Sequence, residues 1–241
     1  MIAYPPLDTL KPVADGIYIV DSLLPGVVGK IFAARMTVIR LGDGTLLLHS
    51  PTRFQDILNQ ELNGIGQIRH LVAPDPAHWM FLPQWQDRYP TATTRAAPGL
   101  RSRSKPRKRG VRLDYDLGSA APAEWGEDIE LVMIPGGFGF HEAAVFHRPS
   151  RTLVLTDLVQ NLEPGKLARP LRPLPRLLGI APPMGGTPLH LRWVINLRRN
   201  EASAATHRLL DLEPERVLFA HGLWFRDNGT TALRSALRWL L

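Results

Sequence analysis

The chain of 241 residues carries 29 lysines and arginines against 22 acidic residues, and it contains no cysteine. The lack of cysteine excludes disulfides, thiolate metal sites and cysteine nucleophiles. Seven basic residues and no acidic residue fall in RSRSKPRKRGVR, residues 101–112, and this segment accounts for the net charge of +7. We therefore predict a basic, solvated surface loop at 101–112, with contact to a polyanion as the alternative interpretation.

Two features of the chain bear on its location. The amino-terminal residues MIAYPPLDTLKP show no apolar stretch behind a basic start, which a signal peptide would have. The longest uncharged stretch, residues 177–191, is interrupted by prolines and glycines, so we expect no transmembrane segment. Together with the absence of cysteine, these features favour a cytoplasmic protein.

Hydrophobic periodicity and turn residues indicate the secondary structure in chain order. Strands are predicted at 16–21, 35–41 and 45–50, followed by a helix at 54–62, a strand at 67–73, a helix at 80–88 and a short strand at 91–97. After the basic loop we predict strands at 129–134, 142–148 and 152–157, then an irregular proline-rich segment at 163–188. A helix at 201–212, a strand at 216–220 and a helix at 231–241 complete the chain. This order predicts an α/β (α+β) fold, in which two sheets lie between helices in a single domain, 1–241.

Polar side chains follow three of the predicted strands directly. Asp75 and His78 follow HLVA, Asp157 follows TLVLT, and His221 follows RVLFA. Loops at strand ends are the usual place for a functional site on a rigid scaffold. We therefore interpret these side chains as candidates for one shared site.

His49 and Ser50 also lie at the end of a predicted strand. Adjacent residues on a strand point to opposite faces of the sheet, so we do not expect them to act as a pair. We interpret both as structural, with Ser50 a candidate for the wall of a pocket.

Five longer phrases resemble the metallo-β-lactamase superfamily, and in particular a branch known only as a domain of unknown function. They are RMTVIRLGDGTLLLHSPT (35–52), RHLVAPDPAHWMFLPQW (69–85), FHRPSRTLVLTDLVQN (146–161), ERVLFAHG (215–222) and ALRSALRWL (232–240). The phrases sample nearly the whole chain. The resemblance implies the four-layer αββα sandwich of that superfamily, with its site at the strand ends.

The resemblance also locates the superfamily's metal-binding loop, His-x-His-x-Asp-His, directly after a strand. Two histidines of this loop hold one metal ion, and the Asp-His pair holds a second. Here Pro74 and Pro76 stand at the first two histidine positions, His78 at the aspartate position and Trp79 at the last histidine position. Proline and tryptophan side chains do not coordinate metals.

The later ligand positions are only partly kept. Gly137 replaces the histidine of the Pro-Gly-His-Thr segment, whereas Asp157, the usual bridging carboxylate, and the late His221 both match. The standard dinuclear zinc hydrolase is therefore not the expected activity.

A smaller metal site is still compatible with the sequence. His78, Asp157 and His221 would supply two imidazoles and a carboxylate, a set that suits one zinc ion or, in a facial arrangement, one iron ion. The alternative interpretation is structural, with hydrogen-bonded histidines and an aspartate that caps a turn. Asp75, His141 and Glu142 are reserve candidates for metal ligands.

The proline-rich segment and the residues after it, 163–198, form a lid-like insertion in this interpretation. Leucines alternate there with basic residues, which favours a cover over the site, or contact with a membrane surface or an acidic partner. If the segment is a lid, Arg169 and Arg172 are the candidates for binding an anionic substrate group.

The sequence leaves two functions open. The first is a mononuclear metal-dependent hydrolase acting on an unknown small molecule. The second is a metal-free binding or scaffolding protein that uses the pocket or the basic loop for recognition. Fold-level analogy alone does not choose between them.

Overall fold

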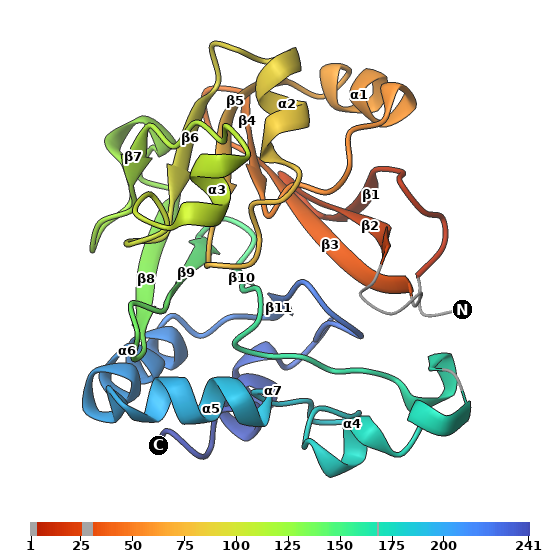
Figure 1. The fold of residues 1–241 in the computed structure, drawn as a ribbon, viewed down its shortest axis with the longest axis vertical. Coiled ribbons are helices and arrows are strands. Elements are labelled where there is room, and N and C mark those ends of the chain that lie inside the picture. Colours follow the sequence, from red (N-terminus) through yellow and green to blue (C-terminus); the bar gives the residue numbers. More distant parts are fainter. Residues whose placement is uncertain (1–3, 26–30, 168) are drawn as a thin grey trace.

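Two sheets form the centre of the fold (Figure 1). The computed structural model describes residues 4–25, 31–167 and 169–241. Among these residues the first sheet has seven strands in the order β1-β2-β3-β4-β5-β6-β7, and the second has four in the order β11-β10-β9-β8. The first sheet comprises β1 Lys11–Ala14, β2 Ile17–Pro25, β3 Ile31–Arg40, β4 Thr45–His49, β5 Gln67–Ala73, β6 Thr93–Ala96 and β7 Tyr115–Asp116. The second comprises β8 Ile129–Pro135, β9 His141–His147, β10 Thr152–Val154 and β11 Arg216–Leu218.

Strand direction decides which loops share an edge. Strands β1 to β4 pair antiparallel, whereas β4, β5, β6 and β7 run parallel, so the carboxyl ends of β4 and β5 lie side by side. In the second sheet β10 and β11 are also parallel, with Val154 opposite Leu218. The segments that follow β4, β5, β10 and β11 therefore have the geometry that a strand-end site requires.

Helices cover the outer faces of both sheets (Figure 1). The α-helices are α1 Asp56–Asn63, α2 Leu82–Arg88, α3 Ser104–Lys108, α4 Leu174–Leu177, α5 Leu189–Asn196, α6 Arg199–Asp211 and α7 Gly229–Ala236. Short 3-10 turns are η1 Ala123–Trp125, η2 Pro164–Lys166 and η3 Arg169–Leu171.

Three apolar cores hold the layers together. Leu58 of α1 and Trp85 of α2 pack on the outer face of the first sheet. Leu47 and Val145 belong to the core between the two sheets. Leu209 of α6 belongs to the core on the outer face of the second sheet, where α5 and α7 also pack. The result is a four-layer αββα sandwich, so the predicted fold class is confirmed.

Three predicted elements need correction. The segment 101–112 is not entirely a loop, because Ser104–Lys108 form α3 around the buried Pro106. Helix α5 follows Pro188 inside the region interpreted as a lid-like insertion, and its Leu191 and Ile195 are buried. The last predicted helix begins and ends earlier, as α7 at Gly229–Ala236. None of the helices in the described part of the chain is long and apolar enough to cross a membrane.

Candidate metal centre

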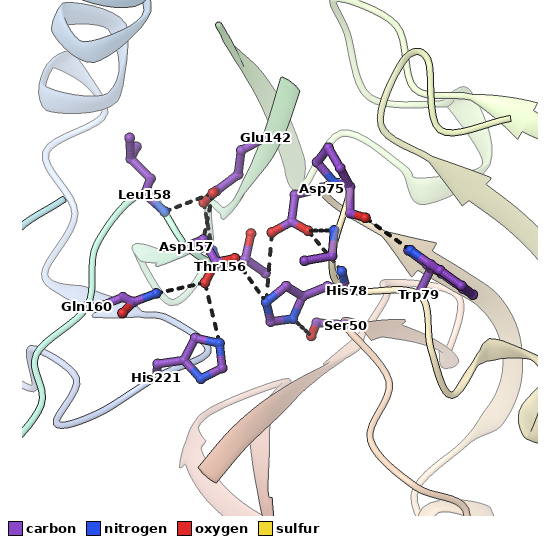
Figure 2. Close-up of polar contacts among 12 residues, drawn as sticks. Ser50, Asp75, His78, Trp79, Glu142, Thr156, Asp157, Leu158, Gln160 and His221 are labelled. Atoms are coloured by element: carbon purple, nitrogen blue, oxygen red, sulfur yellow. Dashed lines mark hydrogen bonds and ion pairs between the residues drawn. The ribbon is translucent and has the colours of Figure 1, made fainter. Parts of the chain in front are cut away.

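Three side chains from three strand-end segments meet in one place (Figure 2). His78 follows β5, Asp157 follows β10 and His221 follows β11. Because β10 and β11 are parallel neighbours, Asp157 and His221 leave the same edge of the second sheet. The backbone N–H of Ala143 on β9 donates to the carbonyl of Pro74 at 2.8 Å, and this bond ties the loop after β5 to the second sheet. We call His78, Asp157 and His221 the His-Asp-His cluster.

The carboxylate of Asp157 lies between the two imidazole rings. Its Oδ1 is 3.3 Å from Nε2 of His221, and its Oδ2 is 3.4 Å from Nε2 of His78. One potential ligand atom from each residue lies within 4.8 Å of the other two. A single ion bound by all three would need only small adjustments of these side chains, because metal–ligand distances are about 2.0–2.2 Å.

The second nitrogen of each ring is fixed by the protein. Nδ1 of His221 is 2.8 Å from the carbonyl oxygen of Ala33. A carbonyl only accepts, so Nδ1 donates to it, and Nε2 is the ring nitrogen that faces Asp157. Nδ1 of His78 is 2.6 Å from Oγ of Ser50. Hydrogen bonds of this kind orient histidine ligands in metal sites.

Two buried carboxylates, those of Glu142 and Asp75, accept hydrogen bonds from the backbone segments that carry the cluster. Glu142 accepts hydrogen bonds from the backbone N–H groups of Thr156 at 2.7 Å, Asp157 at 3.0 Å and Leu158 at 2.8 Å. These bonds fix the turn that presents Asp157 to the histidines. Figure 2 shows the carboxylate of Glu142 directed at this turn rather than at the rings.

Asp75 is fully buried beside His78. Its Oδ1 accepts from the backbone N–H groups of Ala77 at 2.7 Å and His78 at 2.9 Å. Its Oδ2 lies 3.8 Å from Nε2 of His78 and has no hydrogen-bond partner among the described residues. A buried carboxylate oxygen without a partner is costly, and a cation nearby would offset that cost.

The electrostatics of the cluster also favour a cation. Burial alone would lower the pKa of His78, but the carboxylates of Asp75 and Asp157 raise it to about 10. Burial would raise the pKa of Asp157, whereas His78 and the hydrogen bonds to both rings hold it well below its usual range. Burial and the charges of Asp75 and Asp157 raise the pKa of Glu142 to about 8. The donor set therefore fits a bound metal ion.

The His-Asp-His cluster is accessible from a cavity of about 140 Å³. Leu24, Met80 and Phe81 contribute apolar wall, and Ser50 lines the same cavity. The side chains of the cluster are 9–18% exposed, so they are reachable but largely shielded from water. An ion held there would retain an open side toward the cavity.

The reserve candidates and the arginines lie elsewhere. Asp75 and Glu142 are behind the cluster, and His141 is not among the residues whose ligand atoms converge. Arg169 and Arg172 are exposed, and none of the residues that line the cavity comes from 163–198. The structure thus brings the three principal candidates together and does not bring the two arginines to them.

Two other ligand positions of the superfamily, those of Trp79 and Gly137, carry no ligand here. The indole N–H of Trp79 donates to the carbonyl of Pro76 at 3.0 Å, and Figure 2 shows the ring directed away from the cluster. A Cβ at Gly137 would lie 2.3 Å from Cδ1 of Leu197, so Leu197 occupies the space that a side chain there would need.

Comparisons with known proteins bear on the family and the fold of the chain. Residues 14–178 match the model of a family described as "Domain of unknown function (DUF4336)". A comparison with curated protein sequences finds no match.

Similar solved structures include metallo-β-lactamases. The enzyme from Pontibacter korlensis is 13% identical with a TM-score of 0.62, covering 96% of this chain and 97% of that one. The enzyme from Hirschia baltica is 13% identical with a TM-score of 0.64, covering 96% of each. FIM-1 from Pseudomonas aeruginosa, in its mono-zinc form, is 13% identical with a TM-score of 0.60, covering 97% of this chain and 96% of that one. At such identities the likeness establishes the fold alone.

Proposed function

The chain belongs to the DUF4336 family and has the metallo-β-lactamase fold, and from that premise we propose that it is a mononuclear metal-dependent hydrolase. His78, Asp157 and His221 are the ligands in this proposal, and the ion is one zinc or iron. Two imidazoles and one carboxylate are a ligand set that either metal accepts. An ion held by these three residues would supply an activated water molecule as the nucleophile.

One observation carries the proposal. Nε2 of both histidines faces the same carboxylate, at 3.4 Å and 3.3 Å, while Nδ1 of each ring is engaged by Ser50 or by the carbonyl of Ala33. Structural histidines need only one good hydrogen-bond partner. Two rings held by their Nδ1 atoms, with both Nε2 atoms converging, form an arrangement that suits metal coordination.

The surrounding residues have defined roles in this account. Ser50 and the carbonyl of Ala33 orient the two rings, and Glu142 fixes the turn that carries Asp157. The apolar wall of Leu24, Met80 and Phe81 limits the water that reaches the cluster. With a volume of about 140 Å³, the cavity admits a small substrate or the end of a larger one.

A chromogenic panel tests the reaction. Metal-stripped protein would be loaded with zinc or ferrous iron and assayed on nitrophenyl esters, a nitrophenyl phosphodiester and a chromogenic β-lactam. We expect hydrolysis of at least one class by the loaded parent, none by His221→Ala, and full activity in His207→Ala, which alters an exposed histidine on α6. Activity that survives in His221→Ala would overturn the assignment of this ligand.

A metal-free binding protein is the second candidate. Its support is that Asp157 already pairs with both histidines in the structure, so the cluster does not depend on an ion for its contacts. Failure to retain zinc or iron, with the fold intact, would favour recognition through the cavity instead of hydrolysis.

A further inference from the structure

A second cavity lies away from the His-Asp-His cluster, between the segment around α4, helix α5, and the end of α7 with the residues that follow it. It has a volume of about 300 Å³, and none of the residues that line it lines the first cavity. Figure 1 shows α4 and α5 along the lower edge of the molecule, with α7 next to α5. Arg176, Arg192 and Arg238 contribute to its wall, and we call it the arginine cavity.

The charge of the arginine cavity is uncompensated. No acidic side chain lines it, and within the described ranges Arg176, Arg192 and Arg238 form no ion pair. Burial, and then the charge of Arg238, lowers the pKa of Arg192, because the two cations repel each other without a carboxylate between them. Three arginines around one cavity without a counter-ion create a positive potential that favours an anion there.

Arg192 is held in a fixed position at this cavity. Its Nε donates to the carbonyl of Thr187 at 2.8 Å, and its guanidinium lies 5.6 Å from the centre of the Trp239 ring. The Trp239 N–H in turn donates to Oγ1 of Thr187 at 3.1 Å. These contacts leave the terminal Nη groups of Arg192 without a hydrogen bond to any described residue, which suits a planar, bidentate contact with a ligand.

The absence of side chains at two glycines makes room for this arrangement. A Cβ at Gly186 would lie 2.5 Å from the carbonyl oxygen of Gly179 and 3.2 Å from Nη2 of Arg192. A Cβ at Gly179, where φ is +66°, would lie 3.5 Å from the same Nη2. Any larger residue at Gly186 would thus displace Arg192 or the backbone beside it.

We propose that the arginine cavity binds a molecule through a phosphate group. Three positive charges match a multiply charged phosphate better than a single carboxylate, and guanidinium groups pair bidentately with phosphate oxygens. The cavity is at the small end of the range for small-molecule sites, about 300–1,000 Å³, and is larger than a bare phosphate ion needs. Trp239, Met184 and the Pro182-Pro183 pair offer apolar surface to the rest of the ligand.

Calorimetric titration with inorganic phosphate and pyrophosphate tests the proposal on the full chain. We expect saturable binding that is tighter for pyrophosphate, and a loss of about tenfold in affinity for Arg238→Gln and for Arg176→Gln, because a charge-assisted hydrogen bond is removed in each. Both residues are exposed, so neither variant should impair folding, which thermal unfolding would verify. Arg192→Lys keeps the positive charge but removes the planar guanidinium that allows a bidentate contact, so it should weaken binding as well.

Two controls make the result decisive. Arg199→Gln alters an exposed arginine on α6 and Arg107→Gln one in the basic segment 101–112, and both should leave affinity unchanged. Sedimentation with phosphatidic acid vesicles, repeated with Arg238→Gln, would show whether the phosphate belongs to a soluble molecule or to a lipid headgroup. No binding of any probe, or binding reduced equally by the controls, would overturn the proposal.

Discussion

Oγ of Ser50 lies 2.6 Å from Nδ1 of His78, although 28 positions separate the two residues in the chain. Ser50 directly follows β4 and has a φ of +56°, in the left-handed region that most side chains avoid. The residue with this backbone conformation is thus the one whose hydroxyl contacts the ring of His78, a candidate metal ligand. Unusual backbone conformations of this kind cluster at functional sites.

Replacement of Ser50 should weaken metal binding without destroying the fold. Ser50→Ala and Ser50→Gly both remove the hydroxyl that orients His78, so we expect each to lower zinc affinity by about 10–100-fold. Glycine tolerates a positive φ, so Ser50→Gly should be the more stable of the two by about 1 kcal/mol. Calorimetric zinc titration and urea unfolding measure the two effects separately. Parent-like affinity in both variants would show that the hydroxyl does not position the ring.

The buried Glu142 offers a second test, because its carboxylate accepts hydrogen bonds from three backbone N–H groups of the turn that carries Asp157. Glu142→Ala leaves all three donors unsatisfied, and we expect it to lower the free energy of unfolding by about 3 kcal/mol or more. Glu142→Gln retains one acceptor oxygen, so its free energy of unfolding should lie between those of Glu142→Ala and the parent. Glu215→Gln, at an exposed position, is the matched control. If urea unfolding gave Glu142→Ala the same free energy of unfolding as the control, this role of Glu142 would be contradicted.

The pH dependence of stability should depend on His49. This residue is 1% exposed, and burial lowers its pKa to about 3 from an ordinary value of 6.5. Between about pH 3 and pH 6.5, His49 is therefore protonated in the unfolded chain and neutral in the folded chain. Because only the unfolded state binds this proton, the stability of the fold decreases as the pH is lowered below 6.5. The contribution of this one side chain is about 1.4 kcal/mol per pH unit in that window.

His49→Asn would remove this contribution. Its free energy of unfolding, measured in urea from about pH 7 to about pH 4, should vary less steeply than that of the parent. His190→Asn changes an exposed histidine and should keep the parent slope. An unchanged slope in His49→Asn would mean that the protonated ring is tolerated in the folded protein.

Much of the fold could be predicted from the sequence, because buried strands and the stretches that resemble the superfamily are recognised from residues close together in the chain. The positions of Asp75, His78, Asp157 and His221 directly after apolar strands predict their shared edge, and the structure brings them together. Such agreement is expected where strand direction alone decides which loops meet.

The contacts that orient the cluster could not be predicted in the same way. The expectation for Ser50 rested on its neighbour His49, whereas its partner comes from the loop after β5. The arginine cavity combines Arg176, Arg192 and Arg238, which are far apart in the chain and meet only through helix packing. Helix α5 itself follows a proline-rich stretch, where prolines obscure the helical period of its buried Leu191 and Ile195.

Elemental analysis of protein purified without a histidine tag tests the central claim most directly. The parent should carry close to one zinc or iron per chain, Asp157→Ala and His221→Ala should carry almost none, and His190→Ala should match the parent. A parent that contains no metal, even after incubation with zinc and with ferrous iron, would contradict the metal-dependent account of this site.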